Sequence, residues 1–126
     1  MMIRKLTEGD VFDMGAGDTR RVVHPGMGAK QLTLNYAVFE PGQAFAQHVH
    51  TLPTEDVIVV LKGRGVIRVG GEDHPIEEGD AIWVEAGVQH GTINTGDGEM
   101  VLVSCQAPPD AALYSGKYVK GSQDES

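Results

Sequence analysis

Two histidines separated by one residue are the first feature of this chain that could carry chemistry. His48 and His50 lie at positions i and i+2, and on a β-strand this spacing places both imidazoles on one face, where two nitrogens can chelate one metal ion. An acidic residue follows a short loop later, at Glu55 or Asp56, and a third histidine, His90, follows the next hairpin. Imidazoles with one carboxylate predict a metal site that keeps open coordination positions for chemistry.

The remaining candidate groups predict less. We expect His24 and His74 to be ordinary polar surface residues. The single cysteine, Cys105, excludes both a thiolate-rich structural zinc site and an internal disulfide, and we expect it to be a small buried residue, with a position facing the metal cavity as the alternative. The large aromatic residues are expected in the core or in the wall of a cavity; they are Tyr36, Phe39, Phe45 and Trp83.

The elements that position these residues are predicted to be β-strands. Apolar and other residues alternate with a period of two over residues 32–39, and Val57 to Leu61 is a run typical of a strand buried on both faces. The pair Gly70-Gly71 between two such runs predicts a hairpin in which both glycines take positive φ. No window of helical length has a convincing 3.6-residue period. Short strands with turn signals every 8 to 12 residues therefore predict an all-β sandwich or closed barrel.

Two longer motifs resemble the signatures of the cupin family. The first family motif, G-x5-H-x-H-x3,4-E-x6-G, corresponds to the segment from Gly42 to Gly63. The second, G-x5-P-x-G-x2-H-x3-N, corresponds to the segment from Gly79 to Asn94, with Glu85 in place of the proline. The resemblance covers residues 42–94. It implies an all-β cupin double-stranded β-helix, which is a jelly-roll barrel with a metal ion inside one end.

The resemblance also implies the ligands and the ion. It implies one divalent transition metal ion per chain, Fe, Mn, Ni or Zn, on His48, His50, His90 and a carboxylate. Four residues separate His50 from Glu55, and six separate Asp56 from Gly63, so each carboxylate satisfies one half of the motif and the loop has one extra residue. Strand phase favours Asp56, because a loop accommodates an insertion more easily than a strand does. Glu55 stays as the alternative, because aspartate is the shorter side chain.

Length and composition predict one domain with three parts. At 126 residues the chain can bury one respectable core. We expect N-terminal edge strands of the barrel over 1–31, the cupin barrel core over 32–108 and a partly disordered C-terminal extension over 109–126. The net charge of -8 disfavours nucleic acid and anionic membranes as partners. The longest apolar run is too short to span a bilayer, and the first residues contain no signal-like apolar region, so we expect a cytoplasmic protein.

Function is predicted only as a class. Cupins include dioxygenases, isomerases, cyclases, lyases and simple binding modules, and the family is usually dimeric. The resemblance thus implies a homodimer. Our leading expectation is a metal-dependent enzyme that acts on a small organic molecule, with an oxidoreductase of the dioxygenase type among the candidate classes. The alternative is a non-catalytic module that binds a small ligand. No catalytic residue is assigned beyond the ligands, because the carboxylate not bound to metal is the only local candidate for a general base.

Overall fold

A computed structural model describes residues 1–13, 17–50 and 52–110 of the chain. Within these residues the protein contains strands and two short 3₁₀ turns, η1 (Leu6–Glu8) and η2 (Pro25–Met27), and no α-helix. The predicted all-β class is confirmed. No helix in this part of the chain is long and apolar enough to cross a membrane.

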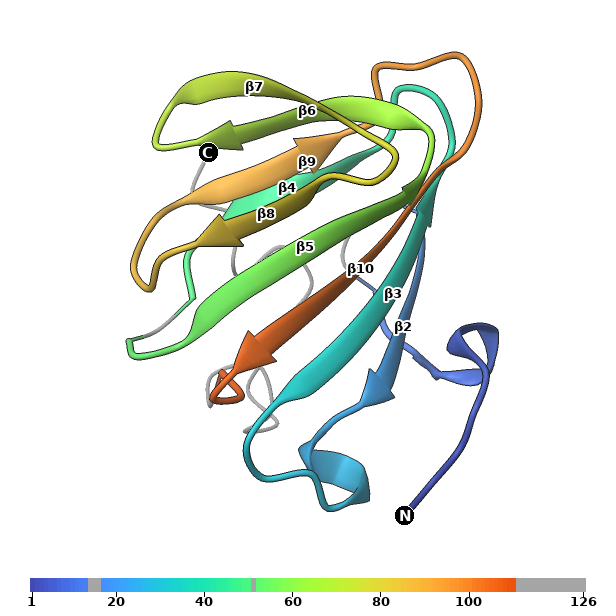
Figure 1. Ribbon diagram of the computed structural model, residues 1–126, viewed down its shortest axis with the longest axis vertical. Helices are drawn as coiled ribbons and strands as arrows, with labels where there is room; N and C mark the ends of the chain where they lie inside the picture. The colour runs from blue at the N-terminus through green and yellow to red at the C-terminus, as the bar shows by residue number, and fades with distance from the viewer. Residues whose placement is uncertain (14–16, 51, 111–126) are drawn as a thin grey trace.

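Ten strands form two antiparallel sheets (Figure 1). One sheet has the order β1-β2-β3-β10-β5-β8, and the other has the order β4-β9-β6-β7. In Figure 1, β6, β7, β9 and β4 gather in the upper part of the view, and β5, β10, β3 and β2 sweep below them. The strands are β1 (Asp10–Val11), β2 (Asp18–Val23), β3 (Thr33–Phe39), β4 (Ala44–His48), β5 (Glu55–Lys62), β6 (Arg64–Val69), β7 (Glu72–Glu77), β8 (Ala81–Val84), β9 (His90–Ile93) and β10 (Met100–Ala107).

The N-terminal segment contributes β1 and β2, which extend the six-stranded sheet beyond β3. Position 10 on β1 pairs with Arg21 on β2, and Arg21 pairs with Asn35 on β3. The predicted C-terminal extension, 109–126, falls largely outside the described residues, which end at Asp110.

The interior between the sheets has an apolar end and a polar end. Along β3 the inward residues change from Thr33 and Asn35 to Ala37 and Phe39. The antiparallel β10 repeats this change in the matching register, with apolar residues opposite Ala37 and Phe39 and polar residues opposite Thr33 and Asn35. Side chains of both sheets form the apolar core, and its members include Ile58, Val60, Ile67, Ile76, Met100 and Leu102. The buried polar side chains at this end are therefore the candidates for a functional site.

The outer face of the six-stranded sheet exposes several large apolar side chains. Val57 and Leu61 are 40% and 43% exposed, so the prediction that this strand is buried on both faces is wrong for the single chain. Trp83 is 61% exposed and lies outside the core, which is a second correction. Strand alternation explains both, because it places Ile58, Val60 and Val84 on the inner face and their neighbours on the outer one.

The tight turns follow the glycines. Gly70 and Gly71 join β6 to β7 with φ of 58° and 87°, which confirms the predicted hairpin. At Gly63, between β5 and β6, φ is 81°, and an added Cβ would lie 2.3 Å from the carbonyl oxygen of Glu99. Only glycine fits such a position without displacing the neighbouring backbone.

Candidate metal centre

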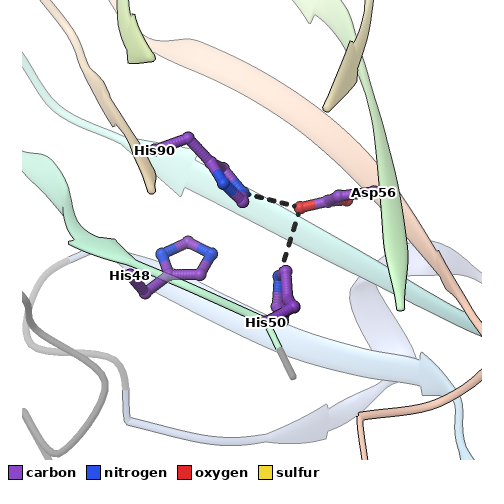
Figure 2. A group of neighbouring side chains, drawn as sticks. All are labelled: His48, His50, Asp56 and His90. Atoms are coloured by element: carbon purple, nitrogen blue, oxygen red, sulfur yellow. Dashed lines mark hydrogen bonds and ion pairs between the residues drawn. The ribbon is translucent and has the colours of Figure 1, made fainter. Parts of the chain in front are cut away.

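Both sheets contribute to a cluster of three histidines and one aspartate at the polar end. His48 ends β4 and pairs in register with His90, the first residue of β9, while Asp56 projects from β5 of the other sheet. His50 follows two residues after the end of β4. Figure 2 shows the four side chains pointing toward one another. The cluster is therefore assembled by strand register at one point between the two sheets.

The four side chains present one ligand atom each within 4.8 Å of one another. This is close to the separation of about 4 Å between ligands on opposite sides of one small ion. Each of the four residues is at most 6% exposed. Glu55, the alternative carboxylate, lies outside the cluster: it is exposed on the outer face, where its Oε1 accepts a hydrogen bond of 2.7 Å from Nε1 of Trp83.

Hydrogen bonds determine which nitrogen of His90 carries the proton. Nδ1 lies 3.0 Å from the carbonyl oxygen of Val88, and since a carbonyl only accepts, Nδ1 is the donor. In the neutral ring, Nε2 then carries no proton, and this nitrogen lies 3.0 Å from Oδ2 of Asp56. A bare nitrogen facing a carboxylate oxygen needs a cation at that point, either a proton or a metal ion.

His50 repeats this arrangement with a different partner. Its Nδ1 lies 3.1 Å from Oδ2 of Asp110, a residue that is 1% exposed. Its Nε2 lies 3.4 Å from Oδ2 of Asp56, and no residue in the described part of the chain makes a hydrogen bond to this buried nitrogen. The same carboxylate oxygen thus faces nitrogens of two imidazoles, which are joined to it by dashed lines in Figure 2.

Charge interactions inside the cluster outweigh the effect of burial. Burial alone lowers the pKa of His50, but its interactions with Asp110 and Asp56 raise this pKa from 6.5 to about 9. Burial alone raises the pKa of Asp56, but its interactions with His50 and His90 hold this pKa well below its ordinary value. In the absence of metal the cluster thus retains a proton at neutral pH, and a metal ion would displace it.

A hydrogen-bonded chain of amides orients Asp56. Oδ1 of Asp56 accepts a hydrogen bond of 3.1 Å from Nε2 of Gln106. Oε1 of Gln106 in turn accepts hydrogen bonds of 2.7 Å from Thr33 and from Nδ2 of Asn35. Such contacts behind a ligand hold it in place and tune its basicity.

The cluster lines a cavity of about 30 Å³. Apolar side chains, among them Phe45, Ile58 and Leu102, form part of its wall, and Arg21 and Asn35 from β2 and β3 reach it as well. A single water molecule needs about 10–15 Å³ of such space. The cavity therefore has room for a small group beside the cluster.

The structure brings together His48, His50, His90 and Asp56 of the residues singled out in the sequence, and leaves out Glu55, His24 and His74. His24 pairs with Asp10 at 2.7 Å near η2, and His74 is exposed on β7. Cys105 lies half-buried on the outer face of β10, so the expectations that it is fully buried or faces the cavity are wrong.

Sequence reasoning missed three residues that surround the cluster: Gln106, Asp110 and Arg21. Gln106 carried a signal, because it continues the inward phase of Met100 and Leu102 with a polar side chain. Asp110 carried none, since it lies 60 positions after His50 in the sequence.

The donor set fits a first-row divalent ion. Imidazole and carboxylate ligands suit iron, manganese, nickel and zinc, and the two imidazole nitrogens that converge on Asp56 leave a position for a cation between them. His48, His50, His90 and Asp56 would hold the ion. It would supply Lewis acidity or, if it is iron, redox chemistry.

Comparisons with known proteins agree with this arrangement. A dimethylsulfoniopropionate lyase of Ruegeria pomeroyi is 31% identical over 64 residues, which are 51% of this chain and 41% of the lyase. An oxalate-binding protein of Thermotoga maritima is 33% identical over 64 residues, which are 51% of this chain and 52% of that protein. The matched region therefore spans about half of each of these relatives or less.

A solved structure resembles the whole barrel. A conserved protein with a double-stranded β-helix domain from Klebsiella pneumoniae superposes with a TM-score of 0.74 at 25% identity, over 88% of this chain and 93% of that one. The family model described as Cupin domain matches residues 35–105, more than half of the chain. The predicted jelly-roll fold is confirmed, and the chain belongs to the cupin family.

Proposed function

We propose that this cupin binds one divalent transition metal ion on His48, His50, His90 and Asp56 and uses it to act on a small organic molecule. The observation that carries the proposal is the convergence of one nitrogen from each of two imidazoles on a single buried carboxylate oxygen. A cavity beside the cluster supplies room for a substrate group at an open coordination position. Iron, manganese, nickel and zinc all suit the ligands, and iron would favour dioxygenase chemistry.

Elemental analysis of untagged protein tests the metal site. We expect near-stoichiometric metal in the wild type and in Glu55→Gln, because Glu55 lies outside the cluster. Asp56→Asn should lose the metal, because it removes the charge that neutralises the ion. Both variants remove one negative charge from adjacent positions, so Glu55→Gln is a matched control. Metal retained in Asp56→Asn and lost in Glu55→Gln would reverse the assignment.

The leading form of this function is a metal-dependent enzyme of the lyase, cyclase, isomerase or dioxygenase type. The similarity to a dimethylsulfoniopropionate lyase supports an enzyme. Here the cavity wall would exclude water, and the ion would polarise a substrate oxygen. Metal-loaded protein should convert a small organic acid to products in a way that is lost in His90→Ala.

One observation favours a non-catalytic binding module as the alternative. Among the described residues that line the cavity, Arg21 is the only titratable residue outside the metal cluster. An arginine side chain stays protonated and is not suited to act as a general base. The similarity to an oxalate-binding protein points the same way. Recovery of a bound organic acid unchanged after prolonged incubation with metal-loaded protein and air would favour this alternative.

We also propose that the outer face of the six-stranded sheet packs against a second copy of the chain in the cytoplasm. Val57, Leu61 and Trp83 form an exposed apolar strip on β5 and β8, next to half-buried apolar residues on β10. A homodimer would cover this strip. Trp83→Glu should convert a dimer to a monomer in light scattering, whereas a monomeric wild type would exclude the proposal.

A further inference from the structure

A row of inward side chains crosses the six-stranded sheet beside the metal cluster. Arg21 on β2 pairs with Asn35 on β3, Asn35 pairs with Ser104 on β10, and Ser104 pairs with Ile58 on β5. All four residues line the cavity. None of them belongs to the metal cluster, so the row forms a second wall with its own chemistry.

Arg21 brings a positive charge to this wall. Its guanidinium lies 4.7 Å from the centre of the Phe12 ring, a stacking contact that orients the planar group. The register of β2 shifts between Arg21 and Val23, and such irregularities often re-aim a side chain next to a site. The neighbouring Arg20 pairs with Asp18 at 2.9 Å on the surface.

Asn35 brings a hydrogen-bond acceptor. Because Asp56 accepts from Nε2 of Gln106, Oε1 of Gln106 faces Asn35 and accepts from its Nδ2. The acceptor oxygen of this amide, Oδ1, is not used by that hydrogen bond. This oxygen is buried, and nothing in the described ranges donates a hydrogen bond to it. A buried acceptor without a donor is costly, so a ligand with a hydroxyl or N–H group would be favoured here.

The charges that face the cavity favour an anion once the metal is bound. Among the described residues that line the cavity, Asp56 carries the only negative charge, and a divalent ion would add two positive charges. A small anion would offset this excess of positive charge. The volume of about 30 Å³ admits only a small ligand.

We propose that the cavity binds a small hydroxycarboxylate, with its carboxylate on Arg21 and its hydroxyl donating to Oδ1 of Asn35. The inference rests on the proposed metal function and adds its substrate class. Arg21 and Asn35 then determine specificity without serving as metal ligands.

Calorimetric titration with four probes tests the inference on metal-loaded protein. Glycolate carries both groups, acetate lacks the hydroxyl, glycolamide lacks the charge, and ethylene glycol lacks the carboxylate. We expect glycolate to bind about tenfold more tightly than acetate, as one hydrogen bond allows, and the two neutral probes to bind most weakly. Glycolate that binds no better than acetate would overturn the inference, and this comparison needs no variant.

Two variants assign the contacts, and a third serves as control. Asn35→Ala should remove the preference for glycolate over acetate. Arg21→Met should weaken both acids by about 10- to 100-fold while it leaves glycolamide unchanged. Arg20→Met removes the same charge from the adjacent, surface-paired arginine and should bind both acids as the wild type does. Equal losses in Arg20→Met and Arg21→Met would reduce the effect to general electrostatics and overturn the inference.

Metal content, measured first for every sample, separates this inference from the proposed function. Stoichiometric metal without a preference for glycolate would refute the inference and leave the metal site standing. If no metal binds, the proposed function fails, and the same titrations on metal-free protein decide the inference. Arg21 and Asn35 would still discriminate glycolate from acetate there, because neither is a proposed ligand; no discrimination would refute the inference.

Discussion

Asp110 should control the affinity of the metal centre through His50. The perturbation is Asp110→Asn, which keeps the shape of the side chain and an acceptor oxygen but removes the charge 3.1 Å from Nδ1 of His50. Carboxylates behind a ligating histidine typically contribute about 10- to 100-fold to metal affinity, or about 1.4–2.7 kcal/mol. Both side chains are almost fully buried, so solvent screens little of this interaction.

The proton on His50 makes the effect depend on pH. With a pKa of about 9 in the metal-free protein, His50 must lose a proton before it can bind the ion, which weakens binding at pH 7 by about 100-fold. Metal affinity of the wild type should therefore rise about tenfold per pH unit between pH 6.5 and 8.5. In Asp110→Asn the pKa of His50 falls, so the rise should be shallower and the deficit in affinity largest at pH 8.5.

Competition with a coloured chelator, run from pH 6.5 to 8.5 with the ion that elemental analysis identifies, measures both quantities. Asp97→Asn removes one charge from an exposed loop position and should match the wild type at every pH. A folded Asp110→Asn protein with the affinity and the pH slope of the wild type would refute the reasoning. Thermal unfolding without metal checks that the variant is folded.

Three further outcomes concern stability. Because the pKa of His50 is raised from 6.5 to about 9, its contribution is fully present below pH 6.5 and is lost as pH rises through 9, so chelator-treated protein should be less resistant to urea at pH 9.5 than at pH 6; equal resistance would contradict this. Phe39→Ala, at a fully buried position, should cost about 3–5 kcal/mol in denaturant titrations, against little for the exposed Val11→Ala. Gly65→Ala would place a Cβ 2.2 Å from a carbonyl oxygen of β9 and should cost about 1–3 kcal/mol, whereas Gly98→Ala meets nothing within 4 Å and should be nearly neutral; similar costs for both would argue against the packing described.

Local signals made the strands and the histidine cluster predictable. The alternation of apolar residues and the positions of the glycines indicate the strands directly. On an inward-facing extended segment, the i, i+2 spacing of His48 and His50 places both imidazoles on the same side. The inward face of a strand was harder to predict where the residues on both of its faces are apolar. Val57 and Trp83 lie outside for this reason, although their apolar character suggested burial. The contact of Asp110 with His50 joins distant parts of the chain and follows from tertiary packing alone.

The division of the interior into an apolar end and a polar end has a consequence for how the barrel opens. At the apolar end, side chains such as Phe39 and Ile67 bring the two sheets together by dispersion and exclusion of water. At the polar end, an ion on His48, His90 and Asp56 would act as a cross-link between β4 and β9 of one sheet and β5 of the other. Removal of this cross-link would leave the apolar end closed and let the polar end fluctuate. Amide hydrogen exchange would then accelerate on one side of the barrel only, so the ion would set the boundary between two cooperative units of a single domain.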